Sequence, residues 1–489
     1  MKLVGFKYQG HDSNLATYED GLIEYCKPER LLGIKHAPVP LAKLLRYCKF
    51  KPDYGCYSLP VQRFLKRGDH LYERHDHKCR FPLYFVDHHY AHLLSAWPII
   101  DLKDVDVGIV LDGLGNRDAR QTAFRQSKGE FKVLERCIGE EYSIGYWFTK
   151  VGNKMLGYKS DIDVAGKVMG AQAYGNVDWE FLKHAKKELT LDCSTYRFES
   201  EIFRNWLATR HKLVEMIVLD FFERHCNPQD TIVYGGGCAL NTVFNETLIQ
   251  KYPNLIILPH AYDGGVSLGC LEFLRQTFDL PKLEKEGFPY WQQDVELEEP
   301  SDETIRKVAE LLADGKVVGW FQGRGELGPR ALGNRSILMN PTIKDGKKFL
   351  NDGIKHREHW RPYAPAVLLE HCPDWFELDE PSPYMLRAVP TKEDKKDLIP
   401  AVVHVDGTSR VQTVSKEDNE VFYQLISEFH KLTGIPLVLN TSLNKAGDPI
   451  YATRKQCLKM LLDTRLDAVC MGDTLRMETT CRDFQHRLL

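Results

Sequence analysis

The stretch VDVGIVLDGLGNRDARQTAF, residues 105–124, indicates the class of fold. It starts as an apolar strand that ends at Asp112 and Gly113, and a second strand pattern follows the glycine-rich turn. The first residues of the chain, KLVGFKYQGHDSNLATYEDGLIEYC (2–26), have the same order of strand, turn and strand. A unit that occurs twice predicts two related halves of an α/β domain that face a central cleft.

Two later segments continue the pattern with helices. DTIVYGGGCALN (230–241) is a strand that runs into a glycine turn and then a helical pattern at 242–252. HAYDGGVSLGCLEFLRQ (260–276) repeats this turn and helix after another strand. Such units bind phosphates at strand ends in α/β proteins, and the backbone N–H groups of the glycines could cradle a nucleotide.

The length of the chain predicts more than one domain. A chain of 489 residues is too long for a single core. Residues 286–300 are rich in proline and charge and are expected to be a linker. We therefore predict a first domain at 1–285 and a second at 301–489, which opens with a helix capped by Ser301.

Composition and charge argue against several classes of protein. A formal net charge of -3 gives no general attraction to nucleic acid or to an anionic membrane. The 13 cysteines include no C-x-x-C pair, which argues against a zinc ribbon, and their odd number argues against a secreted disulfide framework. The sequence shows no signal peptide and no apolar run of about 18 residues, so we expect a cytoplasmic protein without a membrane span.

Three histidines lie close together in VDHHYAHLLSAW (86–97). If this segment is helical, His88 and His92 are one turn apart and point the same way. Asp112 and Asp263 are each interpreted as ending an apolar strand before a glycine. Two imidazoles and two carboxylates suit a divalent metal, so these four residues are candidate ligands. A buried, hydrogen-bonded histidine cluster is the alternative.

The second half of the chain carries a run of cations beside glycine, proline and apolar residues. GWFQGRGELGPRALGNRSIL (319–338) and NDGIKHREHWRPYAPAVL (351–368) contain most of them, and Arg410 follows. Guanidinium groups bind phosphate and carboxylate oxygens in pairs. The pattern predicts a buried anion pocket for a phosphorylated small molecule, with solvated surface charge as the alternative. The cations are Arg324, Arg330, Arg335, Lys355, Arg357, Arg361 and Arg410, with Asn440, Thr441 and Ser442 at the end of an apolar strand.

These stretches together resemble the O-carbamoyltransferase family of antibiotic and nodulation-factor biosynthesis. The resemblance covers nearly the whole chain. Its motifs are GHDSNLA, PERLLGIKH, HHYAH, LDGLG, SIGYWFT, GKVMG, GGGCALN and DGGVSLG in the first half, then GRGELGPRALGNRS, KHREHWRPYAPAV, PAVVHVDGTSRVQTV and LNTSLN. It implies an N-terminal actin/sugar-kinase-like duplicated α/β domain, like that of the tRNA threonylcarbamoyl-transfer enzymes. The C-terminal α/β domain is expected to be like the synthase that makes threonylcarbamoyl-adenylate in that pathway.

The resemblance also implies a reaction. Family members form carbamoyl-adenylate from carbamoyl phosphate and ATP, with Mg²⁺, and then transfer the carbamoyl group to a hydroxyl. Iron, as Fe²⁺, or another divalent ion is the expected metal. The implied metal ligands are His88, His92, Asp112 and Asp263, and the implied carbamoyl phosphate contacts are Arg330, Lys355, Arg361, Arg410 and Ser442.

Further residues are assigned to catalysis and to nucleotide binding. His11 is the candidate base for the acceptor hydroxyl and Asp12 its orienting partner, with a satisfied turn residue as the alternative for His11. Lys167, in GKVMG, is expected to contact nucleotide phosphate. The expected nucleotide-binding residues are Gly113, Gly115, Gly236, Gly237, Asn241, Gly264 and Asn440.

The acceptor is the part of the function that the sequence leaves open. A sugar, an antibiotic-like metabolite or a nucleoside is the leading expectation, and a homodimer is compatible with it. A hydroxymethylated pyrimidine in a nucleotide or in viral DNA is the alternative, favoured by the charged segment 63–81. A hydrogenase-maturation protein should carry extra cysteine pairs, and a non-catalytic nucleotide sensor would have no reason to hold both sites. Family members usually have an acidic residue directly before GK, where this chain has Ala165 and Gly166 after Asp163.

Overall fold

The computed structural model describes residues 1–8, 11–60, 71–75, 80–158, 163–293, 295 and 297–478. The chain divides into two compact units. Unit 1 contains Met1–Pro28 and His36–Phe288, and unit 2 contains Glu29–Lys35 and Pro289–Leu489. This division differs in two places from the predicted domains 1–285 and 301–489.

The first difference lies in the predicted linker 286–300. The backbone N–H of Gln292 donates to the carbonyl of Gly325 at 3.0 Å, and Trp291 is only 3% exposed, so the described residues from Pro289 onward pack within unit 2. The second is the segment Glu29–Lys35, which belongs to unit 2 although unit 1 surrounds it in the sequence. The Arg30 guanidinium donates to two carbonyls of unit 2, those of Glu326 and Gly328, both at 2.6 Å.

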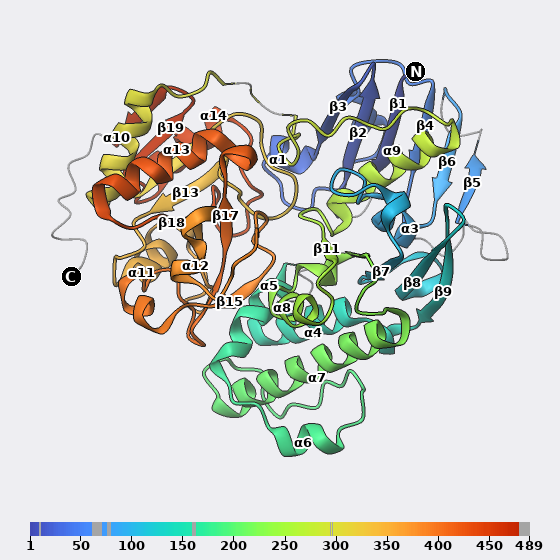
Figure 1. Ribbon diagram of the computed structural model, residues 1–489, viewed down its shortest axis with the longest axis horizontal. Coiled ribbons are helices and arrows are strands. Elements are labelled where there is room, and N and C mark those ends of the chain that lie inside the picture. The colour runs from blue at the N-terminus through green and yellow to red at the C-terminus, as the bar shows by residue number, and fades with distance from the viewer. Residues whose placement is uncertain are drawn as a thin grey trace. The chain divides into compact units, whose positions relative to one another are not determined.

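Unit 1 contains two sheets with the same topology (Figure 1). The first has the order β3-β2-β1-β4-β6-β5 and the second the order β9-β8-β7-β10-β11. The two sheets share an arrangement of five strands, of which three are antiparallel neighbours and the other two continue parallel to the first of these. The first sheet has in addition β5, which pairs with β6 in the antiparallel direction. The predicted actin/sugar-kinase-like duplication is therefore confirmed. The strands are β1 (Leu3–Lys7), β2 (Asn14–Glu19), β3 (Leu22–Cys26), β4 (Tyr54–Tyr57), β5 (Tyr72–His75), β6 (Leu83–Val86), β7 (Val107–Leu111), β8 (Ala119–Ser127), β9 (Glu130–Ile138), β10 (Ile232–Gly235) and β11 (Leu255–Ile257).

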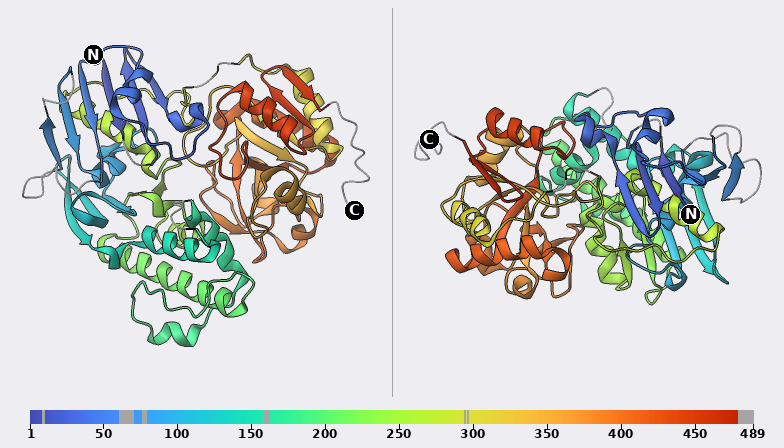
Figure 2. Two further views of the ribbon diagram at one scale, coloured as in Figure 1. Left: turned by 180° about the vertical axis from the view of Figure 1, so that it is seen from behind. Right: turned by 90° about the horizontal axis from the view of Figure 1, so that it is seen from above.

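Helix α9 (Val266–Thr277) packs between β1 and α3 (His88–Leu94), and two glycines allow this close approach. A Cβ atom at Gly5 of β1 would lie 2.8 Å from the backbone nitrogen of Leu271, and one at Gly269 would meet the backbone of Ala91. Figures 1 and 2 show α9 along one face of the first sheet. The start of α9 is thereby placed beside the end of β1 and the histidines of α3.

The remaining helices of unit 1 lie mainly around the second sheet. The long helix α7 lies beside α6, and both are seen in the lower part of Figure 1. Asn241 caps α8, because its side-chain oxygen accepts from the backbone N–H groups of Val243 and Phe244. These helices are α2 (Leu41–Leu44), α4 (Ile144–Leu156), α5 (Val164–Ala171), α6 (Trp179–His184), α7 (Glu201–His225) and α8 (Thr242–Lys251).

Unit 2 is a three-layer α/β unit. Its seven-stranded mixed sheet has the order β17-β14-β18-β13-β12-β19-β20. One face packs Ile305 and Phe422 from α10 and α13, and the other packs Leu350 and Met460 from α11 and α14. The α/β class predicted for this part is confirmed. The elements are α1 (Pro28–Leu32), α10 (Asp302–Ala313), β12 (Val318–Phe321), β13 (Arg335–Met339), α11 (Gly346–Leu350), β14 (Ala364–Leu368), α12 (Cys372–Trp375), β15 (Ala388–Pro390), β16 (Thr408–Arg410), β17 (Gln412–Val414), α13 (Lys416–Thr433), β18 (Leu437–Ser442), α14 (Arg454–Asp463), β19 (Ala468–Met471) and β20 (Thr474–Met477).

Two predictions from composition concern the whole chain. Over the residues that the structure describes, no helix combines the length and apolar character that crossing a bilayer requires. The cysteines within those residues are free thiols, and most are buried. Cys79 and Cys481 lie outside the described residues, as does much of the charged segment 63–81.

Candidate functional site

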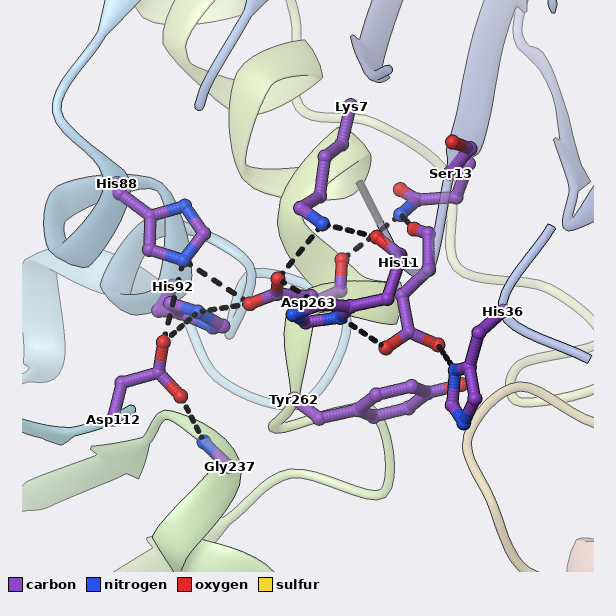
Figure 3. Close-up of polar contacts among 12 residues, drawn as sticks. Lys7, His11, Ser13, His36, His88, His92, Asp112, Gly237, Tyr262 and Asp263 are labelled. Carbon is purple, nitrogen blue, oxygen red and sulfur yellow. Dashed lines mark hydrogen bonds and ion pairs between the residues drawn. The ribbon is translucent and has the colours of Figure 1, made fainter. Parts of the chain in front are cut away.

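The four predicted metal ligands converge in unit 1 (Figure 3). One ligand atom from each of them lies within 4.8 Å of the others. Nε2 of His88 is 3.1 Å from Oδ1 of Asp263 and 3.4 Å from Oδ2 of Asp112. Nε2 of His92 is 3.4 Å and 3.9 Å from the same two oxygens. The two imidazole rings are fully buried, so the cluster is a closed group of nitrogen and oxygen donors.

Local structure fixes the direction of each of these side chains. Asp87 caps α3 by accepting from the backbone N–H of Tyr90, and the helical turn that follows puts His88 and His92 on one face. Asp112 follows β7 directly, and its Oδ1 accepts from the backbone N–H of Gly237 at 2.9 Å. The other oxygen of Asp112 is thereby left facing the histidines.

The predicted context of Asp263 was wrong. The preceding strand, β11, ends at Ile257, and Asp263 begins a short helical turn that leads into α9. Pro259 lies between them, and proline cannot donate to a strand ladder, so the strand does not extend to the aspartate. Asp263 reaches the cluster because α9 packs on α3, and not because it ends a strand.

The electrostatics of the cluster favour a positive charge at its centre. Burial lowers the pKa of His88, but the charges of Asp263 and Asp112 outweigh burial and raise this pKa to about 9. Burial raises the pKa of Asp263, and the charges of Lys7 and His88 outweigh it and bring the pKa well below its usual value. The two carboxylates therefore stabilise a positive charge between them, here that of protonated His88.

The donor set fits the divalent metal that the sequence implied. Two imidazole nitrogens and two carboxylate oxygens suit borderline ions, Fe²⁺ among them. His92 has Nε2 buried without a hydrogen-bond partner among the described residues, as expected of a ligand atom that awaits a metal.

The candidate base and its partner lie beside this cluster. Nδ1 of His11 is 2.8 Å from Oδ2 of Asp12 and 3.7 Å from Oδ2 of Asp263. The His11 side chain is 46% exposed, and the bond to Asp12 leaves its Nε2 free to take a proton from a ligand. Oδ1 of Asp12 accepts from the ammonium of Lys27 at 2.7 Å, which fixes the carboxylate that orients His11.

The predicted nucleotide-binding residues fall into different environments. A Cβ at Gly113 would meet no atom within 4 Å, so space is open beside Asp112. A Cβ at Gly115 would lie 2.5 Å from the His89 ring, and one at Gly264 would lie 2.5 Å from the Tyr262 ring, so packing accounts for both glycines. A Cβ at Gly237 would lie 3.1 Å from Asp112 Oδ1.

Three further predicted residues have structural roles or lie elsewhere. Asn241 caps α8, as described above. Asn440 is in unit 2, where its side-chain amide donates to Gln412 at 2.9 Å, and its role in nucleotide binding stays a prediction. Lys167, on α5, holds its ammonium 5.0 Å from the centroid of the Tyr158 ring.

Gly236 supplies a test of the backbone that orients Asp112. Its φ is +86°, and a Cβ there would collide with the backbone of Leu111. We expect Gly236→Ala to lower the free energy of unfolding by about 3 kcal/mol or more, in chemical denaturation. Gly129→Ala is the matched control, since its φ is +84° but no atom lies within 4 Å of the added Cβ. That variant should lose only about 1 kcal/mol. Equal losses would show that the contact with Leu111 is unimportant.

Unit 2 contains the predicted cluster of cations. Burial lowers the pKa of Arg330 to about 10 together with the charge of Arg361. Burial, then the charges of Arg330, Arg357 and Arg361, bring the pKa of Arg410 well below its ordinary value. Arg361 pairs with Glu358 at 3.5 Å, and several arginines lie close enough for their charges to lower the pKa of their neighbours. Half-buried arginines gathered in this way suit the binding of an anion.

Two predicted members of the pocket contact each other. The Lys355 ammonium donates to the carbonyl of Ser442 at 2.6 Å and to the carbonyl of Asn444 at 2.8 Å. The Ser442 hydroxyl donates to the side chain of Asn444 at 2.6 Å. Lys355 therefore holds the loop after β18 against the pocket, and burial lowers its pKa well below the ordinary value.

Two arginines predicted to bind anions donate to backbone carbonyls. The Arg335 guanidinium is fully buried, donates to the carbonyls of Gln322 and Gly323, and lies 3.7 Å from the centroid of the Phe321 ring. Arg324 donates to the carbonyl of Trp291 at 3.0 Å. For Arg335 the anion-binding prediction was wrong, because its donors are directed at backbone carbonyls. For Arg324 it stays a prediction.

Lys7 and Lys27 are site residues that the sequence prediction missed. Lys7 is 2% exposed and its ammonium is 2.8 Å from Oδ2 of Asp263. The Lys27 ammonium also contacts the hydroxyl of Tyr262, at 2.9 Å. The signal for Lys7 was present: it is the charged residue that ends the apolar strand LVGFK directly before the GHDS turn.

The chain thus combines a duplicated α/β unit that carries four candidate metal ligands with an α/β unit that carries a cluster of cations. Residues 62–229 match the model of the carbamoyltransferase N-terminus, and residues 309–477 match that of the carbamoyltransferase C-terminus. The chain therefore belongs to the carbamoyltransferase family, and it is a carbamoyltransferase.

Individual relatives agree with the family models. The chain is 31% identical over 548 residues to nodulation protein NolNO of Sinorhizobium fredii, covering 96% of this chain and 79% of that protein. It is 32% identical over 438 residues to nodulation protein NolO of Bradyrhizobium diazoefficiens, covering 80% of this chain and 78% of that protein. Among solved structures, the activator of 2-hydroxyisocaproyl-CoA dehydratase from Clostridium difficile with bound ADPNP has a TM-score of 0.34 at 12% identity, covering 58% of this chain and 100% of that one.

Proposed function

We propose that the protein is an ATP-dependent O-carbamoyltransferase whose two units divide the reaction. In unit 2, water removes phosphate from carbamoyl phosphate, and a carbamate oxygen bonds to the α-phosphorus of ATP as pyrophosphate leaves. In unit 1, the acceptor hydroxyl bonds to the carbamoyl carbon, the bond to AMP breaks and the hydroxyl proton passes to a base. The products are the carbamoylated acceptor, AMP, pyrophosphate and phosphate.

The observation that carries this proposal is the concentration of half-buried arginines around the buried Lys355 in unit 2. Burial and then the charge of Arg361 lower the pKa of Arg330. Burial and then the charges of its arginine neighbours lower the pKa of Arg410, so an anion bound among these residues would stabilise their charges. A phosphate dianion, as in carbamoyl phosphate or in ATP bound with Mg²⁺, supplies that charge and accepts paired hydrogen bonds from guanidinium groups. Carbamate is a poor electrophile, so adenylation supplies the leaving group that transfer needs.

Unit 1 supplies the residues for transfer. His88, His92, Asp112 and Asp263 would hold the divalent metal, for which we propose Fe²⁺. A metal bound there supplies a Lewis acid for the carbamoyl oxygen. His11 takes the proton of the acceptor hydroxyl at Nε2, and Asp12 keeps the ring in the orientation that exposes this atom.

The acceptor in this proposal is a small molecule with a free hydroxyl, such as a sugar or a nucleoside. The open space beside Gly113, next to Asp112, supports an acceptor site at the metal centre. The segment 63–81, which would favour a nucleic acid acceptor, lies largely outside the described residues. Because ATP and carbamoyl phosphate are metabolites of the cytoplasm, the proposed reaction takes place there.

Coupling between the two substrates tests the proposal. We expect pyrophosphate to be released from ATP only when carbamoyl phosphate is present, and a suitable acceptor to gain one carbamoyl group by mass spectrometry. Hydroxymethylated nucleotides, duplex DNA that carries them and aminoglycoside-like sugars should be compared side by side. Pyrophosphate release without carbamoyl phosphate would contradict the proposed activation step.

A further inference from the structure

Lys7 is the buried cation closest to the candidate metal ligands and has no role so far. It ends β1, and its side chain is 2% exposed. Its ammonium lies 2.8 Å from Oδ2 of Asp263 and donates to the backbone carbonyl of His11 (Figure 3). It therefore joins a candidate ligand to the turn that carries the candidate base.

The contact divides the two oxygens of Asp263 between two partners. Oδ2 is held by Lys7, whereas Oδ1 is the oxygen that faces His88 and His92, at 3.1 Å and 3.4 Å. Asn14 fixes the backbone of the same residue by donating to the Asp263 carbonyl at 2.9 Å. The carboxylate is thereby prevented from turning both oxygens toward one ion.

The charges around the cluster make Lys7 more than a packing residue. Two carboxylates and two neutral imidazoles carry two negative charges, which a divalent ion would neutralise. The ammonium of Lys7 adds one positive charge next to a ligand oxygen, so the loaded site keeps a net positive charge. A nearby cation in a buried site repels a metal ion and attracts an anionic substrate.

We propose that Lys7 is a positioning residue that limits Asp263 to one ligand oxygen and weakens metal binding so that the loaded site stays cationic. This inference rests on the proposed metal centre of unit 1. It predicts that removing the lysine makes metal binding tighter and carbamoyl transfer slower. A lysine that only stabilises the fold would have the opposite effect on the metal, since its loss would disorder Asp263.

The test measures metal affinity and not only turnover. The metal-free protein is titrated with Co²⁺, and binding is followed by calorimetry and by the visible absorption of the ion. We expect Lys7→Met, a substitution of similar shape, to bind Co²⁺ about tenfold more tightly than the wild type. Its absorption should change as Oδ2 of Asp263 becomes available to the metal. Lys7→Arg keeps the charge and should stay within about threefold of the wild-type affinity.

A matched control separates this effect from the loss of any buried cation. Lys27 is 6% exposed and pairs with Asp12, which is not one of the four candidate ligands of the centre that includes Asp263. Lys27→Met should change the Co²⁺ affinity less than Lys7→Met does. If Lys7→Met does not fold, Lys7→Gln keeps a hydrogen-bond donor without charge and should also bind Co²⁺ more tightly.

The possible outcomes distinguish the role of Lys7 from the proposed metal centre on which it rests. Absence of Co²⁺ binding by the wild type would remove the metal centre itself. Binding by the wild type with equal or weaker binding by the uncharged Lys7 variants would overturn the role of Lys7 and leave the metal centre in place. Tighter binding with an unchanged absorption spectrum would retain the charge effect and overturn the restriction on Asp263.

Discussion

Asp112→Asn is expected to separate the two half-reactions. Carbamoyl transfer to the acceptor should fall about a thousandfold, whereas pyrophosphate release that depends on carbamoyl phosphate should stay within about threefold of the wild type. The reason is that Asp112 belongs to the candidate metal centre of unit 1, whereas the cationic pocket belongs to unit 2.

The substitution changes the ligand and little else. The amide oxygen of asparagine can keep the 2.9 Å bond that Asp112 Oδ1 accepts from the backbone of Gly237. Its NH₂ group would then face His88 and His92 in place of Oδ2, and an amide nitrogen is not a metal ligand. Metal bound per protein, measured by elemental analysis after dialysis, should fall together with transfer.

A neighbouring histidine provides the control for this variant. His89 is as buried as His88 but pairs with the hydroxyl of Thr122 at 2.7 Å and is not in the ligand cluster. His89→Gln should therefore retain metal, although its stability will fall. Loss of metal and transfer to the same degree in both variants would mean that general damage to α3, and not ligation, explains the Asp112 result.

The sequence alone predicted those ligands of the candidate metal centre whose positions depend on local secondary structure. His88 and His92 are one helical turn apart, and Asp112 follows an apolar strand, so periodicity alone placed them. The unit boundaries could not be found in this way. Glu29–Lys35 joins unit 2 through the contacts of Arg30 with carbonyls about 300 residues away, at Glu326 and Gly328. A contact between residues so far apart in the sequence produces no local sequence pattern.

The same limit applies to the cationic pocket. Composition identified a group of arginines beside glycines, but it did not show which way each guanidinium points. Arg335 and Arg410 look alike in the sequence, yet one donates to carbonyls of its own loop and the other stands among cations. Burial and hydrogen-bond partners separate them, and both depend on how the loops pack.

Arg410→Met is expected to raise stability and abolish substrate activation. Nε of Arg410 is buried without a hydrogen-bond partner among the described residues. Its pKa is well below the ordinary value because of burial and of the charges of Arg330, Arg357 and Arg361. Removing this cation relieves repulsion within the pocket, so the free energy of unfolding should rise by about 1 kcal/mol. Pyrophosphate release dependent on carbamoyl phosphate should fall about a thousandfold, because a buried charge that meets the phosphate is lost.

Arg335→Met is the control for the effect of Arg410→Met on the free energy of unfolding. Arg335 is fully buried and its guanidinium donates to the carbonyls of Gln322, Gly323 and Asn334. Its loss removes these buried hydrogen bonds, although the carbonyl of Asn334 still accepts from the backbone N–H of Gln322 at 3.0 Å. This variant should therefore be destabilised by about 3 kcal/mol. Thermal unfolding with and without carbamoyl phosphate measures both effects, and the ligand should stabilise the wild type but not Arg410→Met. Repulsion among the cations of an anion site is relieved when the anion binds. If Arg410 belongs to such a site, Arg410→Met should raise the free energy of unfolding, whereas Arg335→Met should lower it. A destabilised Arg410→Met would instead place that arginine among the structural cations of the fold.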